Sequence, residues 1–281
     1  MKVSNGKIAL SASDLVGYLN CSHLSALDLD VLGGTREKPN YYDPLLELLK
    51  ERGNKHEQAY LDHLQSSGFD YVLIDGVDIS DASVKATLSA MASGARIIVQ
   101  AALRSEGLVG RADILKRIEK PSNFGDWSYE IIDTKLSRET KGGSILQLCL
   151  YADLLSEAQG SPPEHIYIVA PWSDFEPQIF RFNDYSAYYR KVKAGALAAV
   201  MPGGLGETYP EPKSHCDICR WRSDCDARRR SDDHLCLVAN ISKNQISEFK
   251  RNGIDTVKAL AQLPEKIDSK KNSSFQSMNV H

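Results

Sequence analysis

A carboxylate and a lysine two residues apart, at the end of an apolar segment, are the side chains in this sequence best placed to do chemistry. In "EIIDTKL" they are Asp133 and Lys135. Side chains two apart on a strand share one face, so these two groups would emerge side by side. Asp113, in the preceding apolar segment "GRADIL", could lie beside Asp133. Such a set can bind a divalent cation that activates water and stabilises phosphate charge, which predicts phosphodiester hydrolysis.

A histidine and a glutamine–tyrosine pair could complete this set. His56 falls on the apolar stripe of a predicted helix, and Gln147 and Tyr151 are spaced four apart on one face of another. Each feature also has an ordinary interpretation. Asp133 and Lys135 could be a solvated strand end, His56 a hydrogen-bonded core histidine, and the glutamine–tyrosine pair a polar core contact.

Two further acidic residues are expected to lie outside the set. Glu57 follows His56 directly, and neighbours on a helix point about 100° apart, so a surface position is expected. Glu130 is an odd number of residues from Asp133 and should face the other side of the strand.

Three cysteines lie close together in "SHCDICRWRSDCDARRR", residues 214–230. The spacing of Cys216, Cys219 and Cys225 lacks the second close pair of a zinc ribbon and differs from the bacterial ferredoxin pattern. A fourth metal ligand would have to come from elsewhere: from Cys21 for an iron–sulfur cluster, or from His23, His215 or His234 for zinc. A structural role without metal is the third possibility. Cys149 and Cys236 are expected to be core or incidental cysteines.

The elements that must position these residues follow from periodicity. A long helix is predicted over 41–69, with Leu49, Gly53, His56, Tyr60 and Leu64 on one stripe. An earlier helix is predicted over 11–30. Strands and helices then alternate, with strands at 95–103, 107–119, 128–136, 165–172 and 177–183 and helices at 144–159 and 185–201. This order predicts an α/β fold with a central mixed sheet flanked by helices.

Four short motifs in order resemble the RecB-type branch of the PD-(D/E)XK nucleases, over about residues 10–235. They are Gly53-x-x-His56, Gly110-Arg111-x-Asp113, Asp133-x-Lys135 and Gln147-x-x-x-Tyr151. The resemblance implies a restriction-endonuclease-like core and Mg²⁺ or Mn²⁺ held by His56, Asp113, Asp133 and the backbone carbonyl of Thr134. It also implies that Lys135 is the catalytic lysine and that Gln147 lies by the active site, supported by Tyr151. Asp133 stands where many members have Glu, and both occur in the family.

The cysteine arrangement resembles the iron–sulfur staple of AddB-type helicase–nucleases and of CRISPR-adaptation exonucleases. The resemblance implies a [4Fe–4S] cluster on Cys21, Cys216, Cys219 and Cys225 that closes a very long loop, so its loss should destabilise the fold. Arginines crowd the same segment: Arg220, Arg222, Arg228, Arg229 and Arg230. They could contact the phosphates of a nucleic acid, Arg220, Arg222 and Arg228 foremost, or form a solvated helix face.

Composition sets further limits. The chain has 281 residues and a net charge of −3, so nucleic-acid binding would need a local basic patch. No run approaches the ~18 apolar residues of a membrane span, and the N-terminus lacks the features of a secretion signal. A cytoplasmic protein with reduced or metal-bound cysteines and no membrane partner is expected.

Three segments are predicted along the chain. Residues 1–237 form the nuclease domain, 238–265 two short helices joined at Asn252-Gly253, and 266–281 a disordered polar tail. The helical segment resembles one found in uncharacterised RecB-like bacterial nucleases, where it often precedes a further domain. It could be a hairpin whose amides meet a phosphate, or a small packing unit.

The function predicted is that of a metal-dependent DNA nuclease, an exonuclease on single strands or duplex ends in repair, recombination or foreign-DNA processing. DNA is the expected partner, together with a helicase or other missing domain. The alternative is an iron–sulfur-stabilised DNA-binding module that is inactive without such a partner.

Overall fold

The computed structural model describes residues 1–4, 6–40 and 42–263, which fall into two compact units divided between Thr208 and Tyr209. The first unit is built on a six-stranded sheet with the strand order β3-β4-β5-β6-β7-β8. The β3–β4 and β6–β7 pairs are parallel and the other pairs antiparallel, which confirms the predicted mixed sheet. The strands are β3 (Tyr71–Leu73), β4 (Ile97–Ser105), β5 (Leu108–Ile118), β6 (Ser128–Thr134), β7 (His165–Val169) and β8 (Gln178–Arg181).

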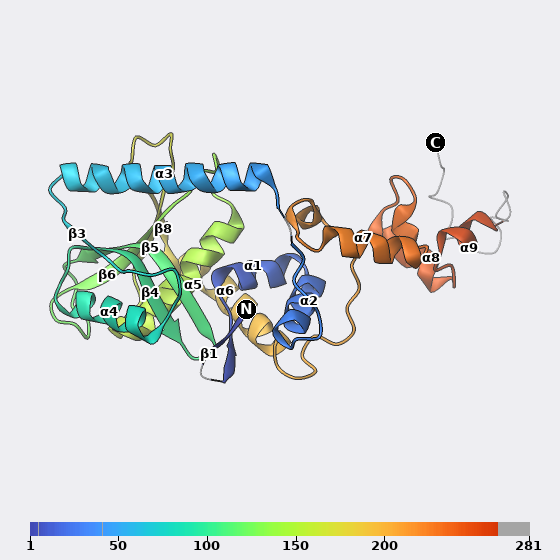
Figure 1. Cartoon of the computed structure of the whole chain (residues 1–281), viewed down its shortest axis with the longest axis horizontal. Helices are drawn as coiled ribbons and strands as arrows, with labels where there is room; N and C mark the ends of the chain where they lie inside the picture. The colour runs from blue at the N-terminus through green and yellow to red at the C-terminus, as the bar shows by residue number, and fades with distance from the viewer. Residues whose placement is uncertain (5, 41, 264–281) are drawn as a thin grey trace. The chain divides into compact units, whose positions relative to one another are not determined.

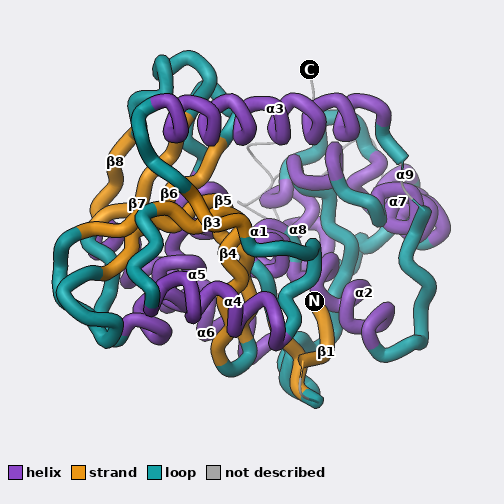
Figure 2. The backbone as a smooth tube through the Cα atoms, turned by 60° about the vertical axis from the view of Figure 1, so that its left-hand side comes forward, coloured by secondary structure: helices purple, strands orange, loops and turns teal. Residues whose placement is uncertain are grey.

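Helices cover both faces of this sheet (Figures 1 and 2). On one face, Tyr60 and Leu64 of α3 pack against Val99 and Ile132. On the other, α1, α4, α5 and α6 share a core with apolar residues of the strands. The helices are α1 (Ala12–Asn20), α2 (Ser22–Leu32), α3 (Pro44–Ser66), α4 (Asp81–Ala92), α5 (Gly142–Gln159) and α6 (Phe182–Ala199), and β1 (Lys2–Ser4) and β2 (Lys7–Ala9) form a small hairpin.

The predicted strands from residue 95 onward and the helices that follow them are confirmed, with small shifts of their ends. The helix predicted over 11–30 is two helices, because Cys21 adopts an extended backbone between α1 and α2. Among the described residues of the first unit, four elements were not predicted: the hairpin strands β1 and β2, the strand β3, which has only three residues, and the helix α4. Thr87 of α4 is fully buried and its hydroxyl accepts from the backbone nitrogen of Ala102, so a polar residue stands on the helix's inward face.

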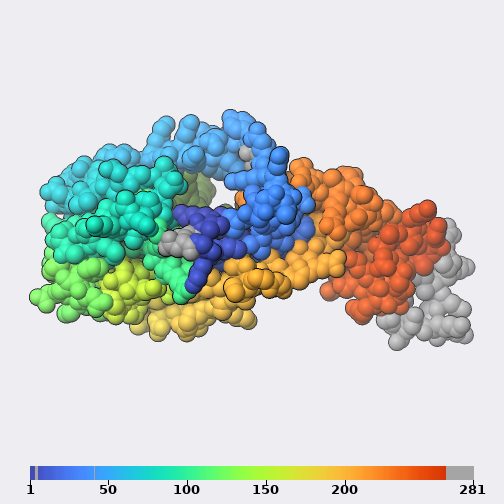
Figure 3. All heavy atoms as spheres, turned by 60° about the horizontal axis from the view of Figure 1, so that its bottom comes forward, coloured from blue at the N-terminus to red at the C-terminus, as the bar shows by residue number. Residues whose placement is uncertain are grey.

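The long helix α3 starts at Pro44, three residues after the predicted start at 41. Asp43 caps it by accepting from the backbone nitrogen of Leu45, and Pro44 occupies its first position. The predicted stripe is buried only in its C-terminal half, whereas Leu49 is 42% exposed. The N-terminal half extends past the sheet in Figure 1, and Figure 3 shows the atoms of α3 at the molecular surface.

The second unit is made of short helices. They are the 3-10 helices η1 (Ser214–Ile218) and η2 (Leu235–Leu237) and the α-helices α7 (Arg222–Ser231), α8 (Lys243–Arg251) and α9 (Val257–Ala261). Leu235, Ile246 and Phe249 form its core. The chain turns between α8 and α9 at Asn252 and Gly253, whose φ of +77° suits glycine, so the two predicted short helices are confirmed.

The boundaries of the segments 1–237 and 238–265 stay a prediction, and the structure groups the cysteine segment with the helices after residue 237. The tail at 266–281 lies outside the described residues. None of the helices in the described part of the chain is long and apolar enough to cross a membrane.

Candidate active site

Two carboxylates and a lysine meet where β5 and β6 pair. The register places Ile114 opposite Ile132, which brings Asp113 level with Asp133. The Lys135 Nζ lies 2.6 Å from the Asp133 Oδ2, and the backbone nitrogen of Thr134 lies 3.2 Å from the Asp113 Oδ2. The structure therefore brings together the groups that strand alternation predicted.

The charges in this cluster are poorly balanced. Asp133 has a fully buried side chain, and burial together with the charge of Asp113 raises the pKa of Asp133 well above its ordinary value. Burial lowers the pKa of Lys135, but the charges of Asp133 and Asp113 outweigh this effect. The pKa of the lysine is therefore raised. Among the described residues, none gives the Asp133 Oδ2 a hydrogen bond of good geometry, so its ion pair with Lys135 is its compensation. A cation would relieve this excess of negative charge.

Gln147 and Tyr151 reach this cluster from α5. The Gln147 Nε2 lies 3.4 Å from the Asp133 Oδ1 and 3.0 Å from the Tyr151 hydroxyl. The predicted pair thus lies at the site, with the tyrosine 7% exposed. Gly110 of β5 makes room for it, because a Cβ there would lie 2.8 Å from the tyrosine ring.

His56 is tied to the end of the sheet. Its Nε2 lies 3.0 Å from the carbonyl oxygen of Val169, which also accepts from the backbone nitrogen of Lys135. A carbonyl can only accept, so Nε2 carries the proton and Nδ1 is left as an acceptor. Phe175 stacks on the imidazole with ring centroids 6.3 Å apart. His56 is therefore a hydrogen-bonded core histidine, and its Nδ1 keeps the capacity to bind a cation.

Glu57 corrects an expectation, since it is not a surface charge remote from the site. It is half-buried and accepts from the Gln100 Nε2 at 2.7 Å. Burial and the charge of Asp113 raise the pKa of Glu57, while Gln100 and Lys135 lower it, which places the carboxylate within electrostatic reach of the cluster.

The helix-direction argument failed for Glu57 because Gln100 departs from strand geometry. It has a φ of +55° and leaves the β4–β5 ladder opposite Asp113, so its amide can reach the flank of α3. Glu130 follows strand alternation and faces elsewhere, accepting from the backbone nitrogen of His165 and the Tyr167 hydroxyl.

The donor set fits a divalent cation in part. In the described residues no three His, Cys, Asp or Glu side chains are close enough together to hold a metal ion. Asp113 and Asp133 supply two adjoining carboxylates of the kind that Mg²⁺ and Mn²⁺ bind, and their mutual repulsion favours a cation. The assignment of His56 and the Thr134 carbonyl as further metal ligands stays a prediction.

The four predicted cluster cysteines are divided between the two units. Cys21 separates α1 from α2 in the first unit. Cys216, Cys219 and Cys225 lie on or next to η1 and α7 in the second. All four are partly exposed and outside disulfides, and the three that share the second unit form no metal-binding group among its described residues. The fold as described thus gives the iron–sulfur prediction no support of its own.

The two remaining cysteines differ. Cys149 is a core cysteine of α5, where burial and the charge of Asp153 raise the pKa of its thiol to about 12. Cys236 is half-buried within η2, and burial also raises the pKa of its thiol.

Three of the arginines near the cysteines, Arg222, Arg228 and Arg229, pair with carboxylates of their own unit. Arg222 and Arg228 are exposed; Arg222 pairs with Asp217 at 3.4 Å, and Arg228 pairs with Asp232 at 3.5 Å. Arg229 is 5% exposed and donates to the carbonyl of Pro210, so it stabilises the fold of its own unit. Arg220 has a buried Nε. Phosphate contact by Arg220, Arg222 and Arg228 stays a prediction.

Gly110→Ala should push the Tyr151 ring out of place and destabilise the protein by about 1 to 3 kcal/mol. Thermal and urea unfolding measure the change. Gly53→Ala is the matched control, because a Cβ at that helical position meets nothing within 4 Å, and a gain of about 0.5 to 1 kcal/mol is expected. Equal stability changes at the two positions would contradict the packing described for Tyr151.

Glu57→Gln should raise the Mn²⁺ concentration needed for half-saturation of the carboxylate cluster by about tenfold, since it removes a carboxylate within electrostatic reach of the cluster. A calorimetric titration with Mn²⁺ measures this shift. Glu51→Gln, an exposed position on the same helix, is the control. An unchanged titration curve for Glu57→Gln would show that this carboxylate does not act on the metal.

Comparison with known proteins identifies the family. No curated protein matches the chain. Among solved structures, the chain is similar to the crystal structure of SSO0001, with 15% identity and a TM-score of 0.40 over 80% of this chain and 89% of that one. The sequence profile of the PD-(D/E)XK nuclease superfamily matches residues 30–226, a span that holds His56, Asp113, Asp133, Lys135 and the Gln147–Tyr151 pair. Since this span is well over half of the chain, the protein belongs to the PD-(D/E)XK nuclease superfamily.

Proposed function

We propose that the protein is a metal-dependent DNA nuclease of the RecB-like branch, which hydrolyses phosphodiester bonds as an exonuclease on single strands or DNA ends. The buried Asp133, paired with Lys135 at 2.6 Å and beside Asp113, is the observation that carries this proposal. Membership of the superfamily supports nuclease activity, and nucleases of this superfamily typically use Mg²⁺ or Mn²⁺.

In the proposed mechanism, Asp113 and Asp133 would hold the metal, with His56 and the carbonyl of Thr134 as further ligands. A metal bound there would lower the pKa of an attacking water and offset charge on the phosphate. Lys135 keeps its proton, because the two carboxylates raise its pKa, so it orients the water or neutralises the transition state. Gln147 fixes the Asp133 carboxylate from the side opposite its ion pair, and Tyr151 fixes Gln147.

The assay that tests this proposal uses end-labelled single-stranded DNA with Mn²⁺, the anaerobically purified protein and an Asp133→Ala control. Metal-dependent shortening that the variant lacks is the expected result, and the product ladder gives the polarity. A parallel RNA substrate tests the preference for DNA. DNA binding without any cutting, by folded protein in Mn²⁺, would replace the nuclease with a binding module that needs a helicase or other partner.

We further propose a [4Fe–4S] cluster on Cys21, Cys216, Cys219 and Cys225, supported by the sequence pattern of one cysteine before the nuclease core and three after it. Iron and sulfide analysis with visible absorption of anaerobically purified protein tests this cluster. Cys219→Ala should lose the iron, whereas the control Cys236→Ala should keep it. Stoichiometric zinc in place of iron, or the absence of metal, would overturn the cluster. A cytoplasmic location and a role in repair, recombination or foreign-DNA processing belong to the same proposal.

A further inference from the structure

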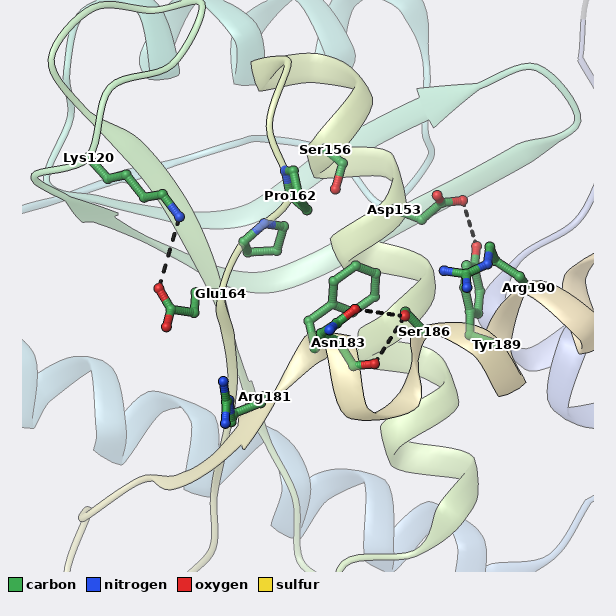
Figure 4. A pocket seen from close by; sticks show the side chains of 12 residues that line it. Lys120, Asp153, Ser156, Pro162, Glu164, Arg181, Asn183, Ser186, Tyr189 and Arg190 are labelled. Atoms are coloured by element: carbon green, nitrogen blue, oxygen red, sulfur yellow. Dashed lines mark hydrogen bonds and ion pairs between the residues drawn. The ribbon is translucent and has the colours of Figure 1, made fainter.

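A cavity of about 550 Å³ lies in the first unit, between α5, α6 and the ends of β7 and β8 (Figure 4). Its volume is within the range of pockets that hold small ligands. Asp153 and Ser156 line it from α5, and Arg181 lines it from the end of β8. Asn183 and Arg190 line it from the N-terminal half of α6.

This cavity is separate from the cluster of carboxylates. Arg181 pairs in register with His165, at the start of β7, whereas Asp133 pairs with Ile168 near the end of that strand. Three residues of strand correspond to about 10 Å. The cavity therefore lies toward the opposite end of β6 from Lys135, and the proposed hydrolysis does not use it.

The acidic groups of the cavity are compensated. Asp153 pairs with Lys193 at 2.6 Å and accepts from the Tyr189 hydroxyl at 2.8 Å. Glu164 lies 4.0 Å from Lys120. These pairs leave little uncompensated negative charge to repel an anion.

Two cations remain. In the described part of the chain neither Arg181 nor Arg190 forms an ion pair with a carboxylate, and both are exposed. Figure 4 shows them on opposite sides of the cavity, with Asn183 and Ser186 between them. An anion seated over Asn183 would have positive charge on both sides, and guanidinium groups match the oxygens of a phosphate.

The remaining wall suits a flat ring. Pro162, Pro163 and Phe182 line the cavity, and nucleobases stack on flat apolar and aromatic side chains. We infer that this cavity binds a nucleoside monophosphate unit, with the phosphate between Arg181 and Arg190 and the base against this wall. The unit comes either from a free nucleotide or from the phosphorylated end of a nucleic acid.

Calorimetric titration in EDTA, where no cutting can occur, tests the inference. The ligands are deoxyadenosine 5′-monophosphate, inorganic phosphate, and one short single-stranded oligonucleotide with and without a 5′-phosphate. Wild-type protein should bind the nucleotide, and Arg181→Gln/Arg190→Gln should weaken binding at least about tenfold. Lys191→Gln, one residue along α6 and outside the cavity lining, should leave the affinity unchanged.

The Asp133→Asn variant should bind the nucleotide as wild type does, which separates this cavity from the carboxylate cluster. If the 5′-phosphate raises the affinity of the oligonucleotide at least tenfold, and this oligonucleotide outcompetes the free nucleotide, a DNA end is the source of the bound unit. Otherwise the free nucleotide is the source. The inference is overturned by the absence of nucleotide binding, by wild-type affinity in the double arginine variant, or by inorganic phosphate binding as tightly as the nucleotide. Because none of these readings requires cleavage, they stand apart from success or failure of the nuclease assay.

Discussion

Asp133→Asn should lower nuclease activity at least about a hundredfold. The same substitution should make the metal-free protein more stable at neutral pH. The activity falls because the proposed mechanism loses one of its two metal-binding carboxylates. The stability rises because the asparagine amide is neutral, like protonated Asp133, and the neutral form is the one that burial and Asp113 favour. A gain of about 1 to 2 kcal/mol in the free energy of unfolding is expected at pH 7.5 in EDTA.

The stability gain of Asp133→Asn should be largest at neutral pH and should shrink as the pH falls. A carboxyl whose pKa is raised by folding binds its proton more tightly in the folded protein. The free energy of unfolding of wild-type protein therefore falls as pH rises from the ordinary carboxyl range through the raised pKa of Asp133. Urea unfolding at several pH values should show the gain of Asp133→Asn shrinking toward acid pH. A variant less stable than wild type at pH 7.5 would contradict the charge imbalance described for the cluster.

Lys135→Met should lower both activity and stability, unlike Asp133→Asn. It removes the cation that compensates a fully buried carboxylate, and breaking a buried ion pair from one side costs about 3 to 5 kcal/mol. The lysine is 26% exposed, so the lower end of that range is expected. Activity should fall by about a hundredfold or more, since the transition state also loses a positive charge.

Unfolding and single-turnover cleavage measure the two effects of Lys135→Met. Lys116→Met, an exposed position on β5, is the control and should change neither by much. Adding Asp133→Asn to Lys135→Met should recover most of the lost stability and none of the activity. Additive stability losses in the double variant would show that the two side chains act independently.

The sequence predicted the parts of the site that depend on the periodicity of a single strand or helix. The period of two on β6 put Asp133 and Lys135 on one face, and they meet as an ion pair. Spacing of four on α5 likewise put Gln147 beside Tyr151. These are local rules that hold wherever the element itself forms.

The features of the fold and the site that the sequence analysis missed depend on contacts between elements distant in the chain. Glu57 is drawn into the site by Gln100, 43 residues away, whose left-handed backbone no periodicity reveals. Leu49 belongs to the predicted stripe of α3 but is exposed, because periodicity does not show where the sheet beneath the helix ends. Both errors arise because a helix's sequence pattern does not show how far its neighbours extend.

The carbonyl of Val169 has a consequence for how this fold can change over time. It accepts from the imidazole of His56 and from the backbone nitrogen of Lys135, so a single oxygen atom links α3, β6 and β7. Sliding β7 by one residue would turn its side chains to the wrong face and remove this shared acceptor at the same time. In related sequences, insertions and deletions should therefore be found in the loops that flank β7 and should be rare within the strand itself.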